Sequence, residues 1–155
     1  MKKRLLAGLA CLGIVLSLFC AGTALAGDPA KASSTDAVAK AQKLVEKGNK
    51  LDDKGDAAGA VKAYAQAIKL DSKNFEAHFN LGFVQLKSGR NDEAEKSLTR
   101  AAALAPADAE TRKLLGIAYI KQGKKAEAIE AWKKSLSLDA KQPDVEKFIQ
   151  MNEEK

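Results

Sequence analysis

Pairs of glycine residues recur along this chain at a fixed interval of 34 residues. Self-similarity with a period of about 20 to 50 residues is typical of architectures in which one supersecondary unit stacks on the next. The interval therefore predicts a row of similar units, an arrangement that presents an extended binding surface and not an active site. The pairs are Gly48 and Gly55, Gly82 and Gly89, and Gly116 and Gly123.

Three consecutive segments, 41–74, 75–108 and 109–142, align without a gap. They share alanine at position 20 (Ala60, Ala94 and Ala128), leucine at position 30 (Leu70, Leu104 and Leu138) and a large apolar residue at position 24 (Tyr64, Leu98 and Trp132). In this register the chain resembles the tetratricopeptide repeat (TPR) family, although only Pro106 keeps the proline that the family usually has at position 32. The resemblance implies an all-α fold, a right-handed superhelical α-solenoid of three helix-turn-helix units.

The glycines have distinct expected roles within each unit. Glycine at position 8 is expected where two antiparallel helices cross closely, with the alanine at position 20 of the second helix facing it. Glycine at position 15 is expected in the turn after the first helix, because a residue without a Cβ reaches positive φ at no steric cost. The last unit needs a cover for its apolar side. Residues 143–155 are predicted to supply this cover as a C-terminal capping helix and tail, with Pro143 in the first turn and Val145, Phe148 and Ile149 on one face.

The N-terminus has the pattern of an export signal. A basic start is followed by an uncharged apolar stretch and by a small-x-small site that ends at Ala26, so residues 1–26 are predicted to be removed before Gly27. The protein is then expected to be periplasmic or secreted. Two alternatives stay open: an uncleaved inner-membrane anchor formed by residues 5–26, and lipidation at Cys11 or Cys20. Residues 27–40 are predicted to be a flexible leader, with the first helix beginning near Thr35 or Asp36.

Removal of the signal changes the charge and the chemistry of the chain. The formal net charge falls from +6 to +3 because Lys2, Lys3 and Arg4 are lost, and no cysteine remains. The other charges alternate in sign along the repeats, which is typical of solvated helix faces and argues against nucleic-acid binding. With one histidine, no metal-ligand pair and no phosphate-binding glycine loop, the sequence indicates neither an enzyme nor a cofactor or metal site. His78 and Trp132 are interpreted as packing residues.

The TPR resemblance implies a concave groove lined by positions 2, 5, 9 and 12 of each first helix. These positions predict an apolar centre, and asparagines at two repeat positions would hold the backbone of an extended peptide. In some family members such asparagines, with basic partners, bind the acidic C-termini of heat-shock chaperones. The basic partners are largely missing here, and that specific function is not expected. The predicted binding residues are Asn49, Phe79, Asn80, Phe83, Leu86, Lys113, Ile117 and Ile120.

Two functions follow from this surface. The first is a non-catalytic interaction scaffold of the cell envelope that binds a peptide, tail or helix of a partner protein, because exposed aromatic side chains anchor many interfaces. The second is a self-assembling structural protein that forms homo-oligomers. In a third interpretation the groove is not open to a partner. Either the capping helix or the leader folds back into it, or Phe79 and Phe83 pack between helices as additional core.

Overall fold

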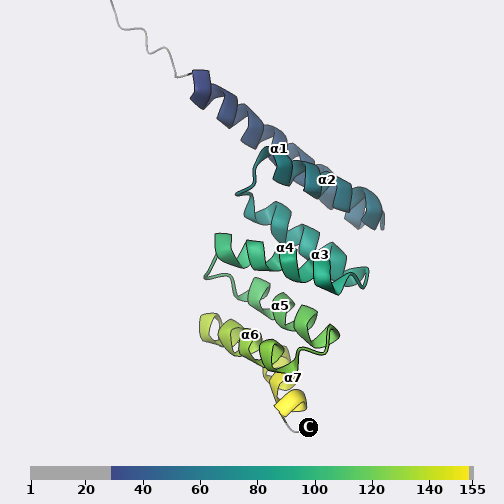
Figure 1. Ribbon diagram of the computed structural model, residues 1–155, viewed down its shortest axis with the longest axis vertical. Helices are drawn as coiled ribbons and strands as arrows, with labels where there is room; N and C mark the ends of the chain where they lie inside the picture. Colours follow the sequence, from purple (N-terminus) through teal and green to yellow (C-terminus); the bar gives the residue numbers. More distant parts are fainter. Residues whose placement is uncertain (1–28, 154–155) are drawn as a thin grey trace, which may run out of the picture.

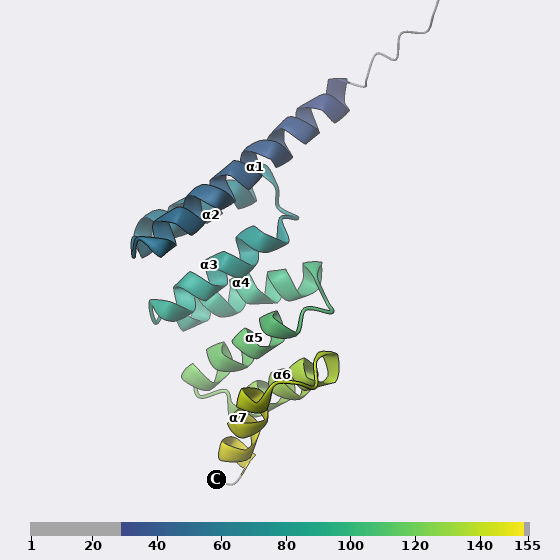
Figure 2. The ribbon, with the colours of Figure 1, turned by 180° about the vertical axis from the view of Figure 1, so that it is seen from behind.

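The computed structural model describes residues 29–153, which form α-helices and short connections. The predicted signal, residues 1–26, lies outside the described residues. The helices stack in chain order from one end of the molecule to the other (Figures 1 and 2). Their bounds are α1 Pro29–Asp53, α2 Ala57–Leu70, α3 Phe75–Lys87, α4 Asn91–Leu104, α5 Ala109–Lys121, α6 Lys125–Leu138 and α7 Pro143–Glu153.

Each odd-numbered helix up to α5 packs on the helix that follows it, and each pair packs on the next pair. The first helices of the pairs also contact one another, α1 with α3 and α3 with α5, so they share one side of the stack. The helix α7 packs on α6 and covers Trp132 with Val145 and Ile149. The predicted all-α solenoid with a C-terminal capping helix is therefore confirmed.

The turns and caps explain where the helices begin and end. Gly55, Gly89 and Gly123 have φ values of 79°, 75° and 77°, as expected for the turn inside each unit. Between units, the side chains of Asn74 and Asp108 accept hydrogen bonds from the backbone N–H groups of Ala77 and Thr111, at 2.8 and 2.7 Å. These caps satisfy N–H groups that the first turn of a helix leaves free.

The glycines at position 8 do lie at close helix contacts, and the atoms nearest to them belong to the large residue at position 24. A Cβ added at Gly48 would lie 2.7 Å from Cδ1 of Tyr64, and one added at Gly82 would lie 2.6 Å from Cγ of Leu98. The large residue at position 24 thus lies against the glycine. The alanines at position 20 are fully buried elsewhere in the same interfaces.

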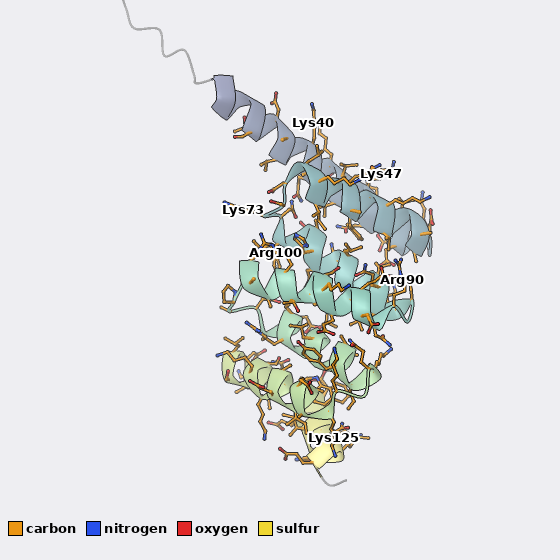
Figure 3. The ribbon with its side chains drawn as sticks, viewed as in Figure 1. Lys40, Lys47, Lys73, Arg90, Arg100 and Lys125 are labelled. Carbon is orange, nitrogen blue, oxygen red and sulfur yellow. The ribbon has the colours of Figure 1, made fainter. Side chains whose placement is uncertain are left out.

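Large buried side chains connect the units. Trp132, Tyr64 and Leu98 are among the most deeply buried, and His78 is 9% exposed, so the packing interpretation of His78 and Trp132 is confirmed. Lysine and arginine side chains project outward along the whole stack, as the labelled examples in Figure 3 show. No helix within residues 29–153 is long and apolar enough to cross a membrane.

The first helix differs from the prediction. Because α1 begins at Pro29, the expected start near Thr35 or Asp36 is wrong, and residues 29–40 of the predicted leader are helical. Proline is favoured in the first turn of a helix, and no glycine or further proline interrupts the sequence before Gly48. The N-terminal part of α1 consequently extends beyond α2 (Figures 1 and 2).

Candidate functional site

A hollow of about 620 Å³ lies on the side formed by α1, α3 and α5. We call it the α1–α3–α5 groove. Four of its lining residues belong to α3: Glu76, Phe79, Asn80 and Phe83. They follow one another at intervals of three, one and three residues, a spacing that puts them on one face of the helix. The lining residues are Asn49, Asp52, Asp53, Tyr64, Glu76, Phe79, Asn80, Phe83 and Glu110.

Two phenylalanines provide the apolar part of the groove. Phe83 is 39% exposed, and it is the large apolar side chain that the groove presents to solvent. Phe79 is half-buried against the core cluster of α3, α4 and α5, and its ring centroid lies 5.7 Å from that of Phe75. Phe79 is therefore held in place, and Phe83 offers its ring to solvent.

The two predicted asparagines meet directly. Nδ2 of Asn80 donates to Oδ1 of Asn49 over 2.9 Å, and the hydroxyl of Tyr64 donates to the same oxygen over 2.8 Å. Nδ2 of Asn49 donates to Oε1 of Glu76 over 3.3 Å. The side-chain oxygen and nitrogen of Asn49 are thus both hydrogen-bonded to neighbouring side chains. In contrast, Oδ1 of Asn80 accepts no hydrogen bond from the described part of the chain.

The groove also carries negative charge. Asp52, Asp53, Glu76 and Glu110 line it, and none of its lining residues is a lysine or arginine. The pKa of Tyr64 is raised to about 12, first because the phenol is buried and then because Asp52, Asp53 and Glu76 disfavour a phenolate. The protein therefore holds Tyr64 neutral, as a hydrogen-bond donor to Asn49.

The prediction that Leu86 lines the groove is wrong. Leu86 is 5% exposed and belongs to the core cluster with Leu98 and Leu114. Leu86 follows Phe83 by three residues, and residues of α4 and α5 together form the cluster in which it is buried. The helical period had placed Leu86 on the groove side, and the contact with the next unit buries it.

None of the three predicted residues of α5 is among the residues that line the groove. Ile117 and Ile120 are half-buried against the cluster that contains Trp132 and the α7 residues Val145 and Ile149. This cluster, which combines residues of α6 and α7, accounts for the burial of these two side chains.

Lys113 is the third predicted residue of α5, and it pairs with Glu110 at 2.6 Å and with Asp144 of α7 at 3.5 Å. These carboxylates, Glu110 first, raise the pKa of Lys113. The predicted continuous patch is therefore divided: four of the eight residues, Asn49, Phe79, Asn80 and Phe83, line the groove.

Sequence reasoning did not find Tyr64 or Asp53 as groove residues. Tyr64 is on the second helix of its unit, and its hydroxyl donates to the groove residue Asn49. Asp53 follows Asn49 by four residues, a spacing that places two side chains on one helix face. That spacing is the signal that could have identified Asp53.

A second hollow, of about 610 Å³, lies between α5 and α6. Its lining mixes charges of both signs, with Arg112, Lys133 and Lys134 beside Glu127 and Glu130. It contains no residue of the predicted site. In the described part of the chain no group of His, Cys, Asp or Glu side chains is arranged to hold a metal ion.

Comparison with known proteins gives consistent similarities. A curated relative, the small glutamine-rich tetratricopeptide repeat-containing protein 2 of Mycosarcoma maydis, is 27% identical over 121 residues. That match covers 78% of this chain, and the chain spans about a third (34%) of the relative's length.

Among solved structures, MamA (residues 41 to the end) from Desulfovibrio magneticus RS-1 has a TM-score of 0.69 and is 30% identical, with 72% of this chain and 63% of that one covered. The first TPR of Spaghetti (RPAP3), bound to the HSP90 peptide SRMEEVD, has a TM-score of 0.73 at 22% identity. This second match covers 76% of this chain and 93% of that one, and it shows a shared fold.

Two family models match this chain, one described as "TPR repeat" over residues 48–89 and one as "Tetratricopeptide repeat" over residues 84–143. Together the matches extend from the first repeat glycine to the start of α7, more than half of the chain. The chain belongs to the tetratricopeptide repeat family.

Proposed function

We propose that this protein is a non-catalytic interaction scaffold that binds a peptide, tail or helix of a partner protein in the α1–α3–α5 groove. The observation that carries the proposal is the open hollow of about 620 Å³ with the exposed ring of Phe83 on its wall. A large aromatic side chain on a rigid helix is a frequent anchor of an interface, because it buries much area at little cost in conformational entropy.

Asn80 supplies a polar contact next to this anchor. Its Nδ2 donates to Asn49, so its Oδ1 is the amide atom that a donor of a bound ligand would use. A backbone N–H of a bound peptide is the simplest such donor. The solved RPAP3 domain, which shares the fold, is bound to a peptide, and this supports a peptide as the kind of ligand.

We further propose that the protein acts in the cell envelope after export. The basic, apolar and small-residue pattern of residues 1–26 supports this proposal. N-terminal sequencing of the protein from fractionated cells tests it: a chain that begins at Gly27 is expected, and a chain that retains residues 5–26 in the membrane fraction would favour an uncleaved anchor.

The binding proposal is tested by site-specific photo-crosslinking in intact cells. A photoreactive phenylalanine analogue is placed at Phe83, and the matched control carries it at Arg100, which is exposed on α4, a helix that contributes nothing to the groove. Crosslinking to another protein from position 83 and not from position 100 is expected. Crosslinking only to a second copy of this chain would favour self-assembly, and equal yields from both positions would contradict the groove as the binding site.

A further inference from the structure

Two carboxylates of the α1–α3–α5 groove have no cationic partner within residues 29–153. Asp53 forms no ion pair among the described residues, and Glu76 receives hydrogen bonds from neutral amides, from Gln42 at 3.1 Å and from Asn49 at 3.3 Å. The other two groove carboxylates are paired at the edge of the groove, with Lys87 and Lys113. The groove therefore keeps a net negative charge beside its aromatic wall.

The contacts of Lys87 show that a cation can lie between a carboxylate and an aromatic ring at this groove. The ammonium group of Lys87 lies 2.9 Å from Oδ1 of Asp52 and 5.3 Å from the centroid of the Phe83 ring. A cation between a carboxylate and an aromatic face gains from both, since the face of the ring is the negative part of its quadrupole. A lysine or arginine of a partner would meet the carboxylates of Asp53 and Glu76 in the groove that Phe83 also lines.

We infer that the occupant of the groove is a cationic segment of a partner protein, in which lysine or arginine side chains flank an apolar residue that packs on Phe83. The inference rests on the proposed function and adds the chemistry of the partner. Charge complementarity carries it, because a segment with acidic side chains would bring like charges next to Asp53 and Glu76. The raised pKa of Tyr64 is consistent with the same negative surroundings.

Three fluorescently labelled octapeptides of one design test the inference: GKLKFLKG, GQLQFLQG and GELEFLEG. Eight extended residues reach about 27 Å, enough to cross three neighbouring helices spaced about 9 Å apart. Titration of each peptide with the purified protein, followed by fluorescence anisotropy at low salt, is expected to show binding at least about tenfold tighter for the cationic peptide than for the acidic one. Added salt should weaken the cationic complex.

Isosteric variants locate the effect. Asp53→Asn and Glu76→Gln should each weaken the cationic peptide about two- to fivefold, the range expected for partly exposed charge pairs, and leave the neutral peptide nearly unchanged. The matched control is Glu46→Gln, an exposed position on α1 outside the groove, which should change neither affinity. Circular dichroism and denaturation of each variant confirm that it is folded.

The outcomes separate the inference from the function on which it rests. If the neutral or acidic peptide binds as tightly as the cationic one and Phe83→Ala weakens that binding, the groove binds peptides but the charge inference is wrong. If no peptide binds, or if Phe83→Ala leaves binding unchanged, the groove is not the site and both proposals fail. Loss of cationic binding in Phe83→Ala, Asp53→Asn and Glu76→Gln, but not in Glu46→Gln, is the supporting result.

Discussion

Replacement of Gly116 by alanine would place a Cβ 2.6 Å from Cε2 of Trp132. No carbon pair is stable at this distance, so the indole ring or the helix must move. Trp132 is 2% exposed, and its Nε1 donates to the carbonyl oxygen of Lys113 over 3.2 Å. Movement of the ring therefore disturbs the packing of α6 on α5 and of α7 on α6, and it disturbs one hydrogen bond.

The magnitude follows from three contributions. Overpacking of a core costs about 1–3 kcal/mol, and loss of the indole hydrogen bond costs about 1 kcal/mol. Alanine is a better helix former than glycine, and this difference stabilises the folded state by about 1 kcal/mol. Gly116→Ala is thus expected to lower the free energy of unfolding by about 1–3 kcal/mol, even though alanine would stabilise an isolated helix.

Chemical denaturation followed by far-ultraviolet circular dichroism measures this loss as a shift of the midpoint at a constant slope. The control is the same substitution in the background Trp132→Ala, which removes the indole ring that the added methyl group would contact. The cost of Gly116→Ala should be smaller there. A Gly116→Ala protein as stable as the wild type, or an equal cost in both backgrounds, would refute the assignment of Gly116 to a close contact with the indole.

Two further predictions concern pH. The pKa of Tyr64 rises on folding from about 10 to about 12, so the folded state favours the neutral phenol. This preference adds at most about 2–3 kcal/mol to the free energy of unfolding. The added stability is complete below pH 10 and is lost as the pH rises toward 12. Alkaline unfolding of the wild type and Tyr64→Phe should show that the variant lacks this decline, and parallel pH curves would contradict the prediction. Burial lowers the pKa of His78 below its usual 6.5, so the unfolded chain binds a proton more readily and stability should fall as the pH drops below about 6.5. Denaturation midpoints from pH 7.5 to 5 should decline less in His78→Gln, and an equal decline in both proteins would show that His78 does not contribute.

Much of the candidate site was accessible from the pattern of residues. The helix period and the repeat register brought Asn49, Phe79, Asn80 and Phe83 to one surface, and the structure places these four in the groove. The same rule failed for Leu86, because a period places a side chain on a face of its helix but does not show how much of that face the next helix covers. The packing of α4 and α5 on α3 decided that Leu86 is core.

The negative charge of the groove depends on contacts between units. Glu76 and Glu110 occupy the same repeat position, and stacking brings Glu76 within hydrogen-bonding distance of Gln42 and Asn49 of the preceding unit. Residues 27 to 34 positions apart in the sequence thus become neighbours. Their combined charge emerges only when the units are assembled.

The sequence by itself determined the class of fold, the register of the units and the positions of the turns. These features depend on local properties of the chain. The properties are the 34-residue period, the volume of the residues at position 24, and the need for positive φ at Gly55, Gly89 and Gly123. Tertiary structure alone decided which apolar residues stay exposed, how the capping helix divides the predicted patch, and that Asn49 is held by Tyr64 and Asn80. These features arise from the packing of one helix pair on the next, and side chains far apart in the sequence come together only through that packing.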